Sequence, residues 1–374
     1  MSFAACNKSS LSICLTPVPH SYCQPTLLMN ELLHAGFFQK ESESTVVTVP
    51  EPGNAAASEQ NPKAYCRARL IEIEQAMRRF FMGREETLKM VLGAFFSDGH
   101  VLVEDVPGVG KTTLAKTLAH CMEVAFRRIQ FTPDLMPSDV IGVSLFDLKS
   151  GTFNFKRGPV FTNILMADEI NRSSPKTQSS LLEAMEERQV TMDGQVYPLE
   201  RPFMVIATQN PVEFEGTFPL PEAQLDRFMV RIDIGYPDAQ TEIDILKKET
   251  LRQDYTMSHP ISKTDLLMIR ETVAEIEVSD AIYSYVQRLL DASRHHHDLH
   301  YGLSPRAGIA LVRMSKFMAL MADRPYVTPD DIRLVVFPVM AHRLVIKPDA
   351  MYRGITEREV VRQLIEMVPV AKKQ

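Results

Sequence analysis

The sequence predicts an α/β fold with a parallel central sheet, followed by an all-α domain. Up to about residue 235, short apolar runs alternate with helical patterns, which is typical of a parallel sheet whose strands are joined by helices. After Gly235-Tyr236-Pro237, only helical patterns follow. The 374 residues are therefore expected to form a flexible extension over 1–61, an α/β core over 62–235 and a helical domain over 236–374.

The composition is that of an ordinary soluble protein, with 45% hydrophobic and 24% charged residues. The net charge of −6 argues against a dedicated nucleic-acid binder, whose domain would usually be basic. No apolar run approaches the roughly 18–20 residues of a membrane span, and the N-terminus makes a poor signal peptide. The five cysteines are odd in number and include no C-x-x-C pair, which suggests reduced thiols. We therefore expect a cytoplasmic protein.

Two helical patterns open the core. They begin near Lys63 and near Glu85, and Met82-Gly83-Arg84 separates them. An apolar run at 100–104 is expected to form the first strand of the sheet. The stretch 124–131, which mixes apolar and basic residues, is expected to form the second.

The segment 132–160 interrupts the alternation of strands and helices. It contains two strand-like runs separated by Lys149-Ser150-Gly151, which is a hairpin turn signal. Insertions on such scaffolds usually carry contacts. Beyond it, Ser174-Pro175 opens a helix with its cap and proline in the expected order, and Met229–Ile234 alternates as the last strand.

The stretch Glu104–Thr113 has the context that a phosphate-binding loop requires, namely a strand, a glycine-rich turn, Gly-Lys-Thr and a helix. Backbone amides of the turn would bind an anion. Lys111 would reach the β- and γ-phosphates of a nucleotide, and the Thr112 hydroxyl would ligate Mg²⁺. Asp105 departs from the consensus, because it stands where the first glycine is expected. The candidate nucleotide-binding residues are Pro107, Gly108, Val109, Gly110, Lys111, Thr112 and Thr113.

Polar residues follow two further apolar runs. Asp168 and Glu169 end the strand that begins at Ile164, and Asn210 follows a strand over Arg201–Ala207. Since the carboxyl ends of parallel strands face the ligand crevice, Asp168 is placed to hold Mg²⁺, and Glu169 to polarise the attacking water. Asn210 would lie beside the γ-phosphate. These residues predict an ATPase that uses ATP and Mg²⁺.

The C-terminal part is predicted to contain six helices, at about 239–252, 264–276, 280–294, 304–321, 328–337 and 355–367. Three consecutive histidines in Arg294–His300 raise the possibility of a metal site. On a helix, only His296 and His300 would share a face. Without a carboxylate at helical spacing, a solvated helix end is favoured over a metal site.

Taken together, these motifs resemble those of the MoxR family of AAA+ ATPases over roughly residues 62–370. A P-loop alone is common, whereas this series in this order is highly specific. The matching stretches are Glu104–Thr112, Met136–Gly142, Ala167–Arg172, Leu181–Glu187, Ala207–Phe228 and Gly302–Ala307. The resemblance implies an AAA+ αβα sandwich with a P-loop, followed by a helical lid.

The resemblance also implies roles for individual residues. Asn210 matches the position called sensor 1, and Arg227 matches the arginine finger, which enters the ATP site of the neighbouring subunit. Arg306 matches sensor 2, which contacts the nucleotide bound by its own chain. The segment 132–160 is similar to the helix-2 insert, which tends to face the ring pore or the substrate. An arginine supplied by a neighbouring subunit raises the rate of hydrolysis by ~10³–10⁵. A lone subunit would therefore hydrolyse ATP slowly, and we expect a ring oligomer, a hexamer.

Members of this family act on partner complexes, often with von Willebrand A-domain proteins, so an ATP-driven remodeller or chaperone is the main prediction. Two other classes stay open. One is a nucleic-acid motor, since minichromosome maintenance helicases share this clade; the acidic balance and the lack of a recognisable DNA-binding domain argue against it. The other is a scaffold that binds ATP without hydrolysing it, and the presence of Glu169 argues against that.

Overall fold

The computed structural model describes residues 61–149, 151–210, 216–251 and 261–370. All of these lie in one compact unit, Val49–Gln374. The extension predicted over 1–61 lies outside the described residues, except for Asn61. None of the helices in the described ranges combines the length and the apolar character that crossing a bilayer requires.

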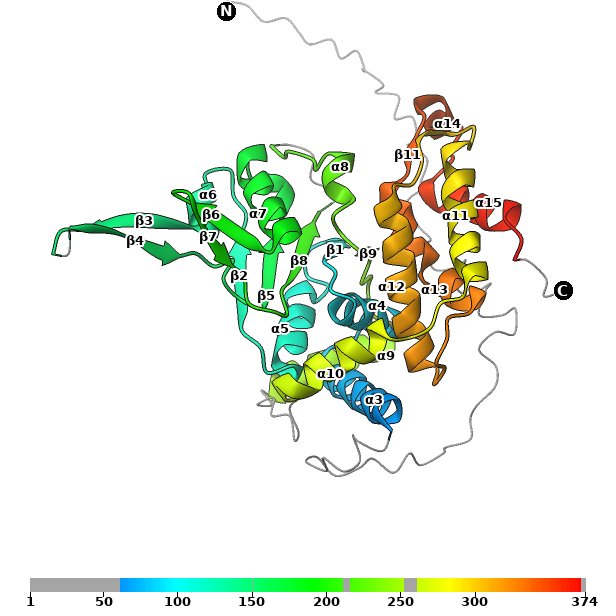
Figure 1. Cartoon of the computed structure of the whole chain (residues 1–374), viewed down its shortest axis with the longest axis horizontal. Helices are drawn as coiled ribbons and strands as arrows, with labels where there is room; N and C mark the ends of the chain where they lie inside the picture. The colour runs from blue at the N-terminus through cyan, green and yellow to red at the C-terminus, as the bar shows by residue number, and fades with distance from the viewer. Residues whose placement is uncertain (1–60, 150, 211–215, 252–260, 371–374) are drawn as a thin grey trace, which may run out of the picture. The chain divides into compact units, whose positions relative to one another are not determined.

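Five parallel strands form the central sheet, in the order β2-β5-β8-β1-β9 (Figure 1). Their bounds are Val101–Glu104 for β1, Phe126–Gln130 for β2, Ile164–Asp168 for β5, Met204–Gln209 for β8 and Val230–Ile232 for β9. Every residue of β5 is buried, as expected for a strand covered on both faces. The predicted parallel sheet is confirmed. The strand expected from Arg201 begins only at Met204, because Pro202 lacks the N–H that a central strand donates.

Helices cover both faces of this sheet. The core helices are α3 (Pro62–Phe80), α4 (Glu85–Phe96), α5 (Lys111–Cys121), α6 (Pro137–Ile141), α7 (Pro175–Glu187) and α8 (Glu222–Leu225). Alternate residues of β1 face opposite sides, since Val101 and Val103 join the larger apolar core whereas Leu102 joins the smaller one beneath α7. The result is the predicted αβα sandwich. Ser174 caps α7 by accepting a hydrogen bond from Thr177 N, as its position in the sequence suggested.

The predicted helices of the C-terminal part are all present. They are α9 (Ala239–Leu251), α10 (Lys263–Ala274), α11 (Asp280–Arg294), α12 (Pro305–Met321), α13 (Pro329–Met340) and α15 (Glu357–Met367). Sequence reasoning missed α14 (Pro348–Tyr352) and the short pair β10 (Leu299–Tyr301) and β11 (Val345–Ile346). These elements follow the sheet in the chain; α11 to α15 belong to a helical lid, whereas α10 contacts α3 and α4 of the α/β part.

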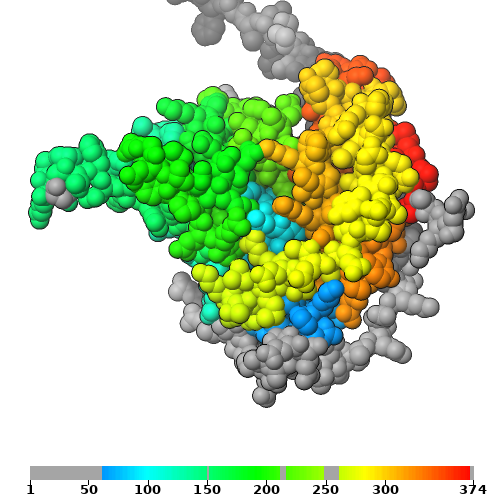
Figure 2. All heavy atoms as spheres, viewed as in Figure 1, coloured from blue at the N-terminus to red at the C-terminus, as the bar shows by residue number. Residues whose placement is uncertain are grey.

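Two hairpins extend the α/β part. The insertion forms β3 (Gly142–Asp147) and β4 (Thr152–Arg157), which project from the body as a narrow arm (Figures 1 and 2). Several large apolar side chains of this arm are exposed, among them Phe146 and Phe153, which face each other across the two strands. The second hairpin, β6 (Gln189–Met192) with β7 (Gln195–Pro198), was not predicted.

A buried ion pair connects the end of α8 to the lid. Arg343 Nε lies 2.8 Å from Asp226 Oδ1, and the side chain of Arg343 is only 3% exposed. The same guanidinium donates to the carbonyl oxygen of Phe228 at 2.6 Å, and Ser304 Oγ donates to Asp226 Oδ2 at 2.9 Å. Because breaking a buried pair leaves one charge uncompensated, these contacts hold α8 firmly against the C-terminal helices.

The described cysteines, Cys66 and Cys121, are buried free thiols, and burial raises the pKa of Cys121 to about 12. A thiol with such a pKa stays protonated and unreactive at neutral pH. The other three cysteines lie outside the described residues.

His100, next to β1, is fully buried in its neutral form. Its Nδ1 accepts a hydrogen bond from Val205 N at 2.9 Å, so its Nε2 carries the proton and donates to Met185 O at 3.1 Å. Burial, and then the nearby charge of Arg188, lower the pKa of His100 from 6.5 to about 4. The folded chain therefore binds this proton only at lower pH than the unfolded chain does.

We expect the free energy of unfolding to fall as pH drops from 6.5 towards 4, because the unfolded state takes up a proton that the fold excludes. His100 should account for roughly 3 kcal/mol of this loss, and His342, whose pKa burial also lowers, adds to it in the same direction. Urea unfolding of His100→Gln across this pH range should give a shallower slope. His295→Gln, at an exposed ring, is the control. Equal slopes in all three proteins would contradict the assignment.

Candidate nucleotide-binding site

The glycine-rich loop between β1 and α5 has the backbone that its sequence requires. Gly108 and Gly110 adopt φ angles of 89° and 93°, a region that favours glycine. Lys111 begins α5, and its Nζ donates to two backbone carbonyl oxygens, those of Asp105 and Gln209. Burial lowers the pKa of Lys111, and the carboxylates of Asp105, Asp168 and Glu169 act against this. The amine therefore lies in the loop, next to the end of β8.

A cavity of about 370 Å³ opens between this loop and the ends of the central strands. It is lined by Pro107, Gly108, Gly110, Lys111, Thr112, Thr113, Arg128, Gln130, Asp168, Glu169, Thr208 and Asn210. The structure thus brings together nine of the predicted site residues from the loop and from the ends of β5 and β8. Val109 packs against the larger core instead.

Asp168 and Glu169 are fixed by neighbours on β2 and β8. Thr208 Oγ1 donates to Asp168 Oδ1 at 2.6 Å and accepts from Glu169 N at 2.9 Å. Arg128 pairs with the other oxygen of Asp168. These contacts hold the Asp168 carboxylate at the edge of the cavity.

Two side chains hold the Glu169 carboxylate. Gln130 Nε2 donates to Glu169 Oε2 at 2.7 Å, and Arg172 Nη1 donates to the same oxygen at 3.0 Å. The backbone of Glu169 is left-handed, with a φ of 55°, which is uncommon for a residue with a side chain. Gln130 lies opposite Asp168 in the register of β2 and β5, and sequence reasoning missed it because register is not visible in one strand alone.

The donor set of the cavity fits Mg²⁺. Thr112 and Asp168 both line it, and their hydroxyl and carboxylate oxygens are the hard ligands that this ion takes. Mg²⁺ usually binds one or two such protein oxygens together with phosphate oxygens and water.

Asp105 explains why this loop lacks its first consensus glycine. Its Oδ2 accepts hydrogen bonds from Ile234 N at 2.8 Å and Gly235 N at 2.7 Å, and its Oδ1 accepts from Val106 N at 2.8 Å. The carboxylate therefore fastens the start of the phosphate loop to the chain that leaves β9. Glycine could not make this connection.

We expect Asp105→Asn to lower the free energy of unfolding by about 1–3 kcal/mol, because its amide cannot accept from Ile234 N and Gly235 N together with Val106 N, so at least one partly buried donor loses its partner. Chemical denaturation measures the change. Asp349→Asn, at a largely exposed carboxylate, should change it little. If the two variants were equally stable, the fastening role of Asp105 would be refuted.

The two predicted arginines lie together, outside this cavity. Arg227 Nε lies 3.1 Å from Glu186 Oε2 on α7, and Arg306, in the first turn of α12, pairs with the other oxygen of Glu186. Neither arginine lines the cavity of its own chain. Arg306 lies beside Arg227 in this structure, and the contact with the nucleotide of its own chain that the resemblance implies stays a prediction.

The histidine cluster differs from the expected helical arrangement, because α11 ends at Arg294. Ligand atoms of His296, His297 and Asp298 lie within 4.8 Å of one another, whereas His300 belongs to β10. His296 uses both ring nitrogens, with Asp298 N at 3.2 Å and Gln363 Oε1 at 3.0 Å. Asp298 is paired with Arg353. The cluster is therefore engaged in contacts within the lid.

The strand order, the phosphate loop and the acids that end β5 define an ATPase of the AAA class. Residues 100–230 match the family described as ATPase family associated with various cellular activities (AAA). Residues 291–364 match the AAA lid domain.

The closer relatives specify the family within this class. The chain is 44% identical over 295 residues to the protein YeaC of Bacillus subtilis, covering 79% of this chain and 92% of YeaC. It is 39% identical over 301 residues to the chaperone MoxR1 of Mycobacterium tuberculosis, covering 78% and 80%. A protein from Cytophaga hutchinsonii with a crystal structure has a TM-score of 0.79 and 38% identity, covering 85% of this chain and 99% of that one. The chain belongs to the MoxR family of AAA+ ATPases.

Proposed function

We propose that this chain hydrolyses ATP at the interfaces of a ring and uses the energy to remodel or assemble partner protein complexes. The observation that carries the proposal is the gathering of Lys111, Thr112, Asp168, Glu169 and Asn210 around one cavity, while Arg227 lies outside it. A cavity that lacks the arginine finger of its own chain fits a site that is completed by Arg227 of a second copy.

Each residue has a chemical role in this proposal. Amides of the phosphate loop and Lys111 bind the phosphates, and Thr112 with Asp168 would hold Mg²⁺, which neutralises phosphate charge. Glu169 accepts a proton from the attacking water, and Asn210 orients the γ-phosphate and that water. Gln130 and Arg172 both donate to Oε2 of Glu169 and orient the carboxylate, which leaves Oε1 to accept the proton.

Arg227 acts on the neighbouring copy in this proposal, where it stabilises the charge that develops during phosphoryl transfer. Glu186 pairs with both Arg227 and Arg306 and so holds the two arginines side by side. A ring of six copies and a von Willebrand A-domain partner belong to the proposal because of the family resemblance. The name of the relative MoxR1, a chaperone, supports action on protein complexes.

Phosphate release by the purified full chain tests the proposal. We expect turnover that requires Mg²⁺, stops with EDTA and rises more than linearly with protein concentration as copies associate. Light scattering with ATP present should report a ring in the same concentration range. Failure to bind or cleave ATP under these conditions would refute the proposal.

A further inference from the structure

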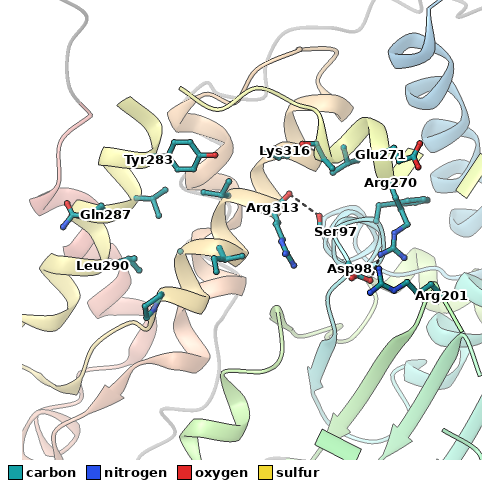
Figure 3. A pocket seen from close by; sticks show the side chains of 18 of the residues that line it. Ser97, Asp98, Arg201, Arg270, Glu271, Tyr283, Gln287, Leu290, Arg313 and Lys316 are labelled. Atoms are coloured by element: carbon teal, nitrogen blue, oxygen red, sulfur yellow. Dashed lines mark hydrogen bonds and ion pairs between the residues drawn. The ribbon is translucent and has the colours of Figure 1, made fainter. Parts of the chain in front are cut away.

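A second, larger cavity lies apart from the nucleotide-binding site. It has a volume of about 740 Å³ and lies between the C-terminal end of α4 and the helices α10, α11 and α12 (Figure 3). It shares no lining residue with the nucleotide cavity. Asp98, in its wall, precedes β1, whereas the phosphate loop follows β1, so the two cavities lie at opposite ends of this strand.

One wall of this cavity is apolar and open to solvent. Leu267 of α10, Tyr283 of α11 and Ile309 of α12 line it, and they are 45%, 49% and 53% exposed. Three large apolar side chains from three helices therefore face water in one place. The burial of such a surface is worth about 25 cal/mol for each Å² removed from water.

Another part of the lining is rich in positive charge. The lining includes four cations, Arg201, Arg270, Arg313 and Lys316, and two carboxylates, Asp98 and Glu271. Asp98 is already paired, with Arg270 and with Arg188 behind the wall. The lining thus carries an excess of positive charge, although the chain as a whole has a net charge of −6.

The excess is not neutralised within the described part of the chain. Figure 3 shows Arg313 and Arg270 extending from different helices toward the space beside Asp98. Arg313 has no hydrogen bond or ion pair to its guanidinium among the described residues. Burial lowers the pKa of Lys316, and the charge of Arg313 lowers it further. Cations crowded in this way would be stabilised by an incoming anion.

We propose that this cavity is a docking site for an acidic, amphipathic segment of a partner protein. Apolar side chains of the segment would cover Leu267, Tyr283 and Ile309, while its carboxylates would reach Arg313 and Lys316. A carboxylate matches the guanidinium of Arg313 in a bidentate pair. The apolar wall distinguishes this occupant from the sugar-phosphate backbone of a nucleic acid. Docking goes beyond the proposed ATPase function and does not require hydrolysis.

Fluorescence anisotropy with the full chain and two synthetic peptides tests the docking site. One labelled helical peptide carries leucines at i, i+3, i+4 and i+7 with glutamates elsewhere, and its twin carries lysines in place of the glutamates. We expect the acidic peptide to bind, its affinity to fall as salt rises, and the basic twin to bind at least tenfold more weakly.

Matched variants locate the binding. Arg313→Glu should weaken the acidic peptide at least tenfold, whereas Arg288→Glu, an exposed cation of α11 outside the lining, should not. Ile309→Ser should weaken it as well, since the apolar wall loses a contact. All three changes are at exposed side chains, and thermal unfolding checks that the fold persists.

Three outcomes would overturn the proposal. Equal binding of the two peptides, or equal affinities of Arg313→Glu and Arg288→Glu, would remove the charge argument. A labelled single-stranded oligonucleotide that binds more tightly than the peptide, and that Arg313→Glu releases, would assign the cavity to nucleic acid. Loss of self-association in Arg313→Glu, with no peptide binding in the parent chain, would assign it to a second copy. ATP turnover is measured separately, so failure of docking leaves the proposed ATPase function untouched.

Discussion

Replacement of Arg227 by alanine is expected to lower phosphate release ~10³–10⁵-fold, because the charge that develops on the γ-phosphate loses its cationic partner. Nucleotide binding should change little, since Arg227 does not line the cavity of its own chain. Phosphate release and titration with a fluorescent ATP analogue measure the two effects. Arg333→Ala, on the exposed surface of α13, is the control and should keep its turnover.

Mixing two inactive variants tests whether Arg227 acts on a neighbour. Arg227→Ala copies keep an intact cavity, and Lys111→Ala copies keep an intact Arg227. If the arginine acts between copies, mixed rings contain complete sites and regain turnover that neither variant has alone. If mixtures stay inactive while rings form, or if Arg227→Ala keeps full turnover with oligomers intact, the assignment fails.

Replacement of Glu169 by glutamine is expected to reduce phosphate release by roughly 10²–10⁴-fold while ATP still binds. The amide has the size of the carboxylate, but it cannot take a proton from water. Titration with ATP and a phosphate-release assay separate binding from turnover. Glu183→Gln, at an exposed residue of α7, makes the same chemical change outside the cavity lining and should have no effect. Undiminished turnover in Glu169→Gln would mean that another group is the base.

The parts of the site that are contiguous in sequence were predictable. Gly108, Gly110 and Lys111 predict the loop directly. The loop needs glycines where φ is positive and a lysine at the start of the helix, and both requirements can be read from the residue types. Asp168 was predictable for a similar reason. A fully apolar run is typical of a central strand, and an acid at its carboxyl end therefore lies at the ligand-binding edge of the sheet.

What the sequence did not reveal depends on register and tertiary packing. Gln130 meets Glu169 only because β2 and β5 pair as they do, and Arg306 meets Glu186 across 120 positions of the chain. The hairpin β6–β7 was missed although Asp193 and Gly194 form a turn signal, and both have the positive φ that such a turn demands. β6 and β7 form a separate two-stranded sheet in which only Val190 is buried, so no buried apolar run marks these strands in the sequence.

The buried pair of Asp226 and Arg343 couples the segment that carries Arg227 to the C-terminal helices. Asp226 is the immediate neighbour of Arg227, and Arg343 follows α13, so the ion pair connects the C-terminal helices to the segment that carries Arg227. Removal of one partner from such a buried pair costs about 3–5 kcal/mol, because the other charge is left without a partner. If Arg227 completes the ATP site of a neighbouring copy, as proposed, a movement of the lid in one copy would move this arginine relative to the nucleotide of the next copy.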